Sequence, residues 1–177
     1  MTPKAFTDGL TLLGDIYPRE LSDAARTLYA QTCGHLADDV WAEAIRRCVA
    51  TRTFYPVPAE ILAAAEAVAI ERAGIAAPDD AWRAVQAVAR GWYPGQTVRG
   101  SLDPLALDAL RDIGGIAAVA GAESIELGRL ARQFRAAYES AARPYVDAAA
   151  RGALDAPPLE TAAIEAPGSS LARVERP

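Results

Sequence analysis

Side chains that could catalyse a reaction or bind a metal are scarce in this chain, and none occurs at a recognised spacing. The 177 residues contain one histidine, His35, and the only lysine is Lys4. There is no HExxH pair, no serine elbow and no GxxxxGK phosphate loop. We therefore expect neither catalysis nor a cofactor. His35 lies beside an apolar helical stripe, and we interpret it as a core or capping residue.

Two pairs of adjacent carboxylates could be taken for acid/base or metal-binding groups. Asp38 and Asp39 form one pair, and Asp79 and Asp80 form the other. Each pair stands at the start of a predicted helix, where negative charge complements the helix dipole, and neighbouring side chains on a helix point in different directions. A cation would need further oxygen ligands, which the sequence does not identify. We expect helix-start residues here and no metal site.

The cysteines and the composition limit the class of protein. Cys33 and Cys48 fall within helical patterns without a CxxC spacing or a companion histidine pair, so we expect small apolar packing residues in a reducing compartment. Eighteen basic and 23 acidic residues give a net charge of −5, which leaves room only for local nucleic-acid contacts. No apolar run approaches the roughly 20 residues that span a bilayer, and nothing at the N-terminus resembles a signal peptide. We expect a soluble cytoplasmic protein that has no membrane contact.

Helical periodicity dominates the first part of the chain, and no segment alternates as a strand would. The pattern predicts helices over 3–16 and 21–35, a third from Asp38 and a fourth from Pro58, which together form an N-terminal four-helix bundle over residues 1–74. The residues that we expect to face its core are Phe6, Leu10, Leu13, Leu21, Ala25, Leu28, Thr32, Leu36, Trp41, Ala44, Ile45, Cys48, Val49, Ile61, Leu62, Ala65 and Val68.

A second small helical domain is predicted over residues 78–150, followed by a flexible tail over 151–177. The tail is rich in proline, alanine, glutamate and serine, a composition that buries too little surface to offset the entropy of ordering. The fold class is therefore all-α. The second domain is expected to open at Pro78, break at Gly91–Gly95, restart at Asp103 and Pro104, break again at Gly114 and Gly115, and end in a long helix over 125–149 that Pro144 kinks.

Gly34 fits the spacing of a DNA-reading helix-turn-helix unit. In such a unit a small residue, a turn glycine and an apolar residue stand as Ala30, Gly34 and Val40 do here. The front of the following helix, however, carries acidic residues that would face phosphates. A tight corner between two helices explains the same glycine. A helix-turn-helix packaging or regulatory protein of the small terminase type is the competing interpretation, and an enzyme with an unfamiliar site is the third.

The most informative stretch is Phe54–Ile61, an aromatic, proline-punctuated junction that opens a helix. Pro56 and Pro58 stiffen the approach because each fixes its own backbone φ angle and restricts the residue before it. Pro58 suits the first helical turn, and Glu60 complements the positive end of the helix. We expect a rigid loop-to-helix junction.

This junction and several later features, in the same order along the chain, resemble the phage-type replicative helicase loader family. The resemblance covers roughly residues 3–145, and the loop Gly91–Gly100 and the proline-rich tail have no counterpart in it. The residues that carry it are Tyr29, Leu36, Asp39, Ala44, Phe54, Tyr55, Pro56, Val57, Pro58, Ala59, Glu60, Ile61, Ala81, Trp82, Val85, Ile113, Gly114, Gly115, Arg132, Phe134 and Tyr138.

The resemblance implies a phage or prophage DNA replication protein that binds the ring-shaped, hexameric replicative DNA helicase. Such a protein suppresses premature helicase activity, or places the helicase on single-stranded DNA, and uses no cofactor. Exposed aromatic and arginine side chains dominate interface energies, so the candidate partner-binding residues are Tyr55, Trp92, Tyr93, Arg129, Arg132 and Arg143. Core packing is the alternative for Tyr55, and a solvated helix face is the alternative for the arginines.

Overall fold

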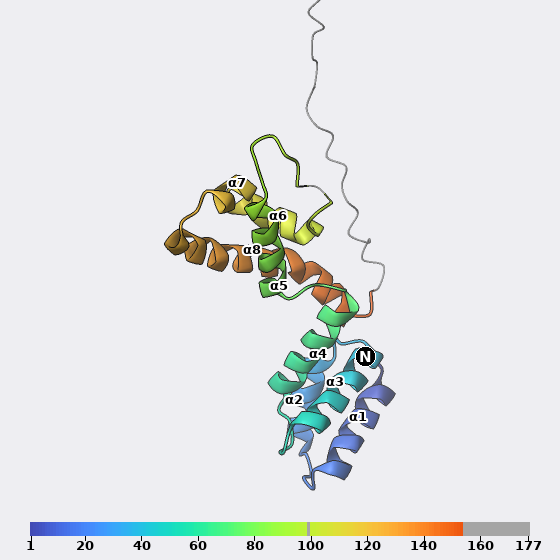
Figure 1. The fold of residues 1–177 in the computed structure, drawn as a ribbon. Helices are drawn as coiled ribbons and strands as arrows, with labels where there is room; N and C mark the ends of the chain where they lie inside the picture. Colours follow the sequence, from blue (N-terminus) through green and yellow to red (C-terminus); the bar gives the residue numbers. More distant parts are fainter. Residues whose placement is uncertain (99, 154–177) are drawn as a thin grey trace, which may run out of the picture.

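The computed structural model describes residues 1–98 and 100–153, and within them the chain forms eight α-helices and no strand (Figure 1). The prediction of an all-α fold is confirmed. Residues 154–177, most of the predicted tail, lie outside the described residues. The helices are α1 (Pro3–Ile16), α2 (Asp23–Cys33), α3 (Asp38–Thr51), α4 (Pro58–Arg72), α5 (Pro78–Arg90), α6 (Pro104–Asp112), α7 (Gly115–Ala120) and α8 (Ser124–Ala150).

Local sequence accounts for where the helices begin. Four of the described helices have a proline at the first position, where its missing N–H is not needed: Pro3, Pro58, Pro78 and Pro104. Asp103 caps α6 as predicted, because its carboxylate accepts a hydrogen bond from the backbone N–H of Ala106 at 2.9 Å. At the start of α4, the Glu60 carboxylate accepts from the backbone N–H of Val57 at 3.0 Å.

The helices α1–α4 share one apolar core, which is centred on α3. This helix packs against α1 and α4, and α2 packs against α4. The Trp41 indole is fully buried and donates to the Ala5 carbonyl at 3.0 Å. The four helices predicted for residues 1–74 are thus present, while a regular four-helix bundle stays a prediction. The buried residues of this first core are Leu13, Tyr17, Tyr29, Cys33, Leu36, Val40, Trp41, Ala44, Ile45, Cys48, Tyr55, Ile61, Ala65 and Val68.

Two residues expected on or beside the buried stripe of the second predicted helix are exposed instead. Leu28 is 54% exposed, and the next residue, Tyr29, enters the core in its place. His35 is also exposed, because the chain leaves the helix after Cys33 and the helical stripe does not extend through the turn. The interpretation of His35 as a core residue was therefore wrong. Both cysteines are buried, as predicted.

A second core lies among α5–α8. It is built around aromatic contacts: the ring centroids of Trp82 and Phe134 are 5.2 Å apart, and those of Phe134 and Tyr138 are 5.8 Å apart. Pro144 lies inside α8, which continues on both sides of it as one helix. The other buried members of this core are Ala81, Val85, Ala89, Leu102, Leu105, Ala106, Ala109, Leu110, Ile116, Val119, Leu130 and Ala142.

The two cores meet where the end of α8 crosses α4 (Figure 1). Ala69 of α4 and Val146 and Ala149 of α8 form a small third cluster of buried residues there. The predicted domain boundary, residues 74–77, connects α4 to α5 near this crossing. None of the helices in the described residues is long and apolar enough to cross a lipid bilayer.

Candidate partner-binding surface

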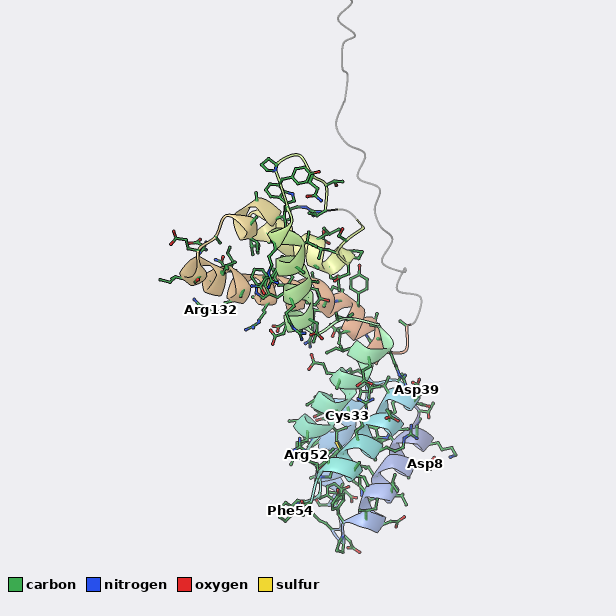
Figure 2. The ribbon with its side chains drawn as sticks, in the orientation of Figure 1. Asp8, Cys33, Asp39, Arg52, Phe54 and Arg132 are labelled. Carbon is green, nitrogen blue, oxygen red and sulfur yellow. The ribbon has the colours of Figure 1, made fainter. Side chains whose placement is uncertain are left out.

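The six candidate residues predicted from the sequence do not gather on one face. Tyr55 lies in the loop between α3 and α4, Trp92 and Tyr93 lie in the loop between α5 and α6, and the three arginines lie along α8. These two loops are at opposite ends of the molecule, and the labelled Phe54 and Arg132 are correspondingly far apart (Figures 1 and 2). A single partner surface cannot use all six.

The loop between α3 and α4 presents a neighbouring aromatic residue in place of Tyr55. Phe54 is 82% exposed, whereas Tyr55 is only 9% exposed and packs into the first core. Val57, on the same short loop, is also exposed. We call Phe54 and Val57 the aromatic tip. Figure 2 shows Phe54 at the end of α1–α4 remote from α8. Phe54 therefore offers a large apolar ring to a partner. Single exposed apolar residues are common on protein surfaces, so the support beneath the ring is what distinguishes this one.

Three tyrosines, Tyr17, Tyr29 and Tyr55, pack together at the loop that carries the aromatic tip. The rings of Tyr17 and Tyr29 lie 5.9 Å and 6.3 Å from the Tyr55 ring, measured between centroids. The Tyr17 hydroxyl donates to the Arg52 carbonyl at 2.9 Å, and the Tyr29 hydroxyl donates to the Pro56 carbonyl at 2.7 Å. The loop is therefore fixed on both sides of Phe54, which is presented by a rigid support.

The environment of these tyrosines is apolar. Burial raises the pKa of Tyr29 to about 12. Burial also raises the pKa of Tyr55, although the nearby guanidinium groups of Arg19 and Arg26 lower it in part. The Tyr17 and Tyr29 hydroxyls act here as hydrogen-bond donors, and the Tyr55 ring acts as a packing group.

Trp92 and Tyr93 differ in exposure, although they are adjacent. Trp92 packs against the second core, and its indole N–H donates to the Gln96 carbonyl at 3.0 Å. Tyr93 is 64% exposed. Trp92 therefore closes its own loop, and Tyr93 is the member of the pair that a partner could reach.

The three candidate arginines of α8 are exposed, as predicted, but two of them already have acidic partners. Arg129 pairs with Glu126, and Arg143 pairs with Glu66 at 3.0 Å and Asp147 at 3.2 Å. Within residues 1–98 and 100–153, Arg132 forms no ion pair. The exposed pairs contribute little to stability, but they reduce the net positive charge that α8 offers a partner.

The acidic pairs at the starts of α3 and α5 are also satisfied within the chain. Asp38 accepts from the Thr2 backbone N–H at 2.6 Å and from its hydroxyl at 2.7 Å, while Asp39 pairs with Arg72. Asp79 and Asp80 pair with Arg135 and Arg83 respectively. Among the residues that the structure describes, no group of three His, Cys, Asp or Glu side chains could hold a metal ion.

Close packing at the corner between α2 and α3 accounts for the glycine at position 34. A Cβ atom at Gly34 would come within 2.4 Å of the Ala30 carbonyl oxygen, so a side chain does not fit there. The following helix, α3, is the centre of the first core and is packed against α1 and α4. The side of α3 that stays exposed begins with Asp39, whose negative charge would face phosphates in a DNA groove. This charge is the feature of α3 that disfavours the helix-turn-helix interpretation.

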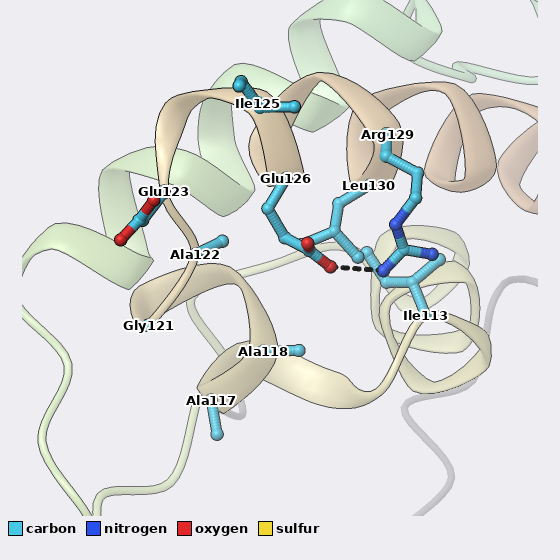
Figure 3. A pocket seen from close by; sticks show the side chains of 10 residues that line it. All are labelled: Ile113, Ala117, Ala118, Gly121, Ala122, Glu123, Ile125, Glu126, Arg129 and Leu130. Atoms are coloured by element: carbon cyan, nitrogen blue, oxygen red, sulfur yellow. Dashed lines mark hydrogen bonds and ion pairs between the residues drawn. The ribbon is translucent and has the colours of Figure 1, made fainter.

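An open hollow of about 530 Å³ lies between α7 and the start of α8 (Figure 3). Ala117 and Ala118 of α7 and Ala122 after it line part of the hollow, and the ion pair of Glu126 with Arg129 lines another part. Ile125 lines it and is 93% exposed. Charged and apolar side chains both line the hollow, and it lies away from the aromatic tip.

No protein-family model, curated protein or solved structure matches this chain. The resemblance to helicase loaders therefore stays a prediction. Phe54 belonged to the motif that carries this resemblance, yet it was not among the candidate binding residues. Phe54 is exposed because the opposite side of the loop faces the core. The sequence signals this only weakly: residues before a proline are extended, and neighbouring side chains in an extended segment point to opposite sides.

Proposed function

We propose that this chain is a phage-type DNA replication protein that binds a hexameric replicative helicase and loads or restrains it, with the aromatic tip as the principal contact. The observation that carries the proposal is the rigid presentation of Phe54. Its ring is held in solvent by a loop whose two sides are hydrogen-bonded to buried tyrosines. Such a ring needs little further ordering when it enters an apolar pocket of another protein.

The mechanism would be differential binding. A protein that contacts one state of the helicase ring better than another shifts the ring toward that state by the difference in binding free energy. The partner is a protein, and single-stranded DNA is engaged only through it, because the chain carries a net charge of −5. Tyr93 and Arg132 are candidates for secondary contacts, since both are exposed.

The test compares two exposed apolar residues at opposite ends of the molecule. Phe54→Ala should weaken binding to the purified hexameric helicase of the host by at least about tenfold, as truncation of an interface anchor does. Ile125→Ala is the matched control, because Ile125 is also highly exposed but lies beside the hollow. It should bind as the unaltered chain does. Circular dichroism checks that both variants stay folded.

Two outcomes would separate the parts of this proposal. Equal binding by Phe54→Ala and the unaltered chain would remove the aromatic tip from the interface and leave helicase binding in place. If the unaltered chain fails to bind the helicase at micromolar concentrations, the helicase partner itself is refuted. Salt-sensitive binding to duplex DNA without helicase binding would support the helix-turn-helix alternative.

A further inference from the structure

The last turns of α8 belong to neither of the two main cores. Up to Ala142, the buried residues of α8 lie in the second core, but Val146 and Ala149 lie in the small third cluster with Ala69 of α4. Ala150 packs against both that cluster and the first core. We call residues 146–153 the latch, because they reach from the second group of helices to the first.

The latch is attached to the first group of helices through the corner between α2 and α3. The backbone N–H of Ala37 donates to the Ala150 carbonyl at 2.9 Å. Gly152 faces the same residue, and a Cβ atom at position 152 would come within 3.0 Å of the Ala37 Cβ. Gly152 also has a φ of +74°, a conformation that favours glycine. This attachment is close, and it depends on the absence of a side chain at position 152.

The apolar contacts that hold the latch are small. The buried members of the third cluster are two alanines and one valine, with Ile70, Ala73 and Ile75 partly buried beside them. The added ion pair between Arg143 and Glu66 is exposed to solvent and therefore weak. Both main cores, by contrast, bury large aromatic rings. The latch should release at a lower free energy than either core unfolds, because the free energy of an opening grows with the apolar surface that it exposes to water.

The chain crosses between the two groups of helices at two places, and each crossing has a weak point. In α8, Pro144 stands after the last buried residue of the second core, Ala142, and two positions before the latch, and it lacks the N–H that would bond the preceding turn. In the other crossing, Gly74 follows α4 with a φ of +65°. A change in backbone direction at either position would move the partly buried residue that follows it, Tyr145 or Ile75, but none of the fully buried aromatic residues of the second core.

We propose that the latch is a conformational device: it detaches from Ala37 and Ala69 as a unit, pivots at Pro144 and Gly74, and lets the two groups of helices move apart while both cores stay folded. The closed form fixes the distance between the aromatic tip and the loop that carries Tyr93. In the open form that distance varies. The device does not depend on the identity of a partner, and it is tested on the protein alone.

Amide hydrogen exchange followed by NMR detects the release directly. The Ala37 N–H is bonded to the latch, whereas the N–H groups of Ile45 and Tyr138 lie inside helices of the first and second cores. Ala37 should exchange at least about tenfold faster than either core amide, and its rate should respond less steeply to denaturant, as a sub-global opening does. Exchange of all three amides with one free energy and one denaturant slope would overturn the proposal.

Gly152→Ala tests the same device by substitution outside both cores. The added methyl group should crowd Ala37 and speed Ala37 exchange by a further tenfold or so, while the Ile45 and Tyr138 amides keep their rates. Gly128→Ala, inside α8, is the control, because a Cβ there meets nothing within 4 Å among the described residues. An unchanged Ala37 rate in Gly152→Ala would contradict the proposed attachment.

A distance measurement shows whether release separates the two groups of helices. Spin labels at Asp8→Cys on α1 and Asp108→Cys on α6 occupy exposed positions, and the native cysteines are buried. The Gly152→Ala background should broaden the label-to-label distance distribution toward longer values. A single distribution that is identical in both backgrounds would show that the latch does not control the arrangement of the two groups.

Discussion

The Tyr29 hydroxyl donates a hydrogen bond to the carbonyl of Pro56 at 2.7 Å, across 27 residues of chain. Pro56 is itself buried, so this bond satisfies a backbone acceptor that water does not reach. Through it, a residue of α2 determines the position of the loop between α3 and α4. The bond links the packing of the first core to the presentation of Phe54.

Removing that bond should destabilise the protein. Tyr29→Phe keeps the ring and deletes the donor, which leaves the Pro56 carbonyl unsatisfied, so we expect a loss of about 1–2 kcal/mol in the free energy of unfolding. Urea unfolding followed by circular dichroism measures it. Tyr145→Phe is the control, because the partly buried Tyr145 makes no side-chain hydrogen bond within the described residues. Equal losses in the two variants would contradict the role of the bond.

Gly9 should tolerate no side chain, because α1 lies directly against the Trp41 ring. A Cβ at position 9 would come within 2.3 Å of the indole nitrogen, which is also the donor to Ala5. We expect Gly9→Ala to cost about 1–3 kcal/mol of stability through overpacking. Thermal unfolding measures the change.

Gly14 on the same helix supplies the matched comparison. A Cβ there meets nothing within 4 Å, and alanine is the better helix former, so Gly14→Ala should stabilise the protein by about 0.5–1 kcal/mol. If both substitutions shift the melting temperature in the same direction, the close contact between Gly9 and Trp41 is not what decides the outcome.

Acid should weaken the contact between α3 and α4. The Arg47 guanidinium bonds Glu71 at 2.6 Å and holds the pKa of that carboxyl below its ordinary value of 4.5. The pKa of Glu43 is also lowered, first by the hydrogen bond from Arg46 and then by that from Arg47 at 3.2 Å. A depressed folded-state pKa gives stability that is fully present above about pH 4.5 and is lost as the pH falls through the lowered values.

Arg47→Gln should therefore make the free energy of unfolding less dependent on pH in the acid range. Its unfolding free energy should fall less than that of the unaltered chain between about pH 5 and pH 3. Added salt should narrow the difference, since these groups are exposed. Arg26→Gln is the control, because Arg26 forms no ion pair in residues 1–98 and 100–153. Identical acid profiles for all three proteins would contradict the prediction.

The buried cysteines should report unfolding. Burial raises the pKa of the Cys33 thiol to about 11 and also raises that of Cys48. Reaction with a water-soluble disulfide reagent at about pH 8 needs both access and thiolate, so the folded protein should react at least about a hundredfold more slowly than the urea-unfolded chain. Rapid labelling of either cysteine without denaturant would show that the first core is open.

Helix positions were predictable because their signals are local. A proline at the first position and the Asp103 cap mark several starts, and these act within one helical turn. The exposure of neighbouring residues was harder. Leu28 and Tyr29 are both suitable for a core, and the choice between them depends on the loop before α4, which lies 27 residues away in the chain.

The same limit applies to the candidate binding residues. Tyr55 and Phe54 are adjacent aromatics, and only the long-range bonds of Tyr17 and Tyr29 decide which one faces solvent. The arginines of α8 were predicted correctly as exposed. The pair of Arg143 with Glu66 was not predictable, because the two residues are separated by 77 positions in the chain, whereas Glu126 with Arg129 and Arg143 with Asp147 have the local spacing of helical ion pairs.

The supports around the aromatic tip act on the backbone and on Tyr55, and the side chain at position 54 takes no part in them. Position 54 is thus thermodynamically uncoupled from folding. Natural drift or a randomised library could exchange that one residue for a charge, a hydroxyl or another ring at almost no cost in stability. If the aromatic tip binds a partner, the preference for that partner can change through substitutions at position 54 without a matching change in the stability of the fold.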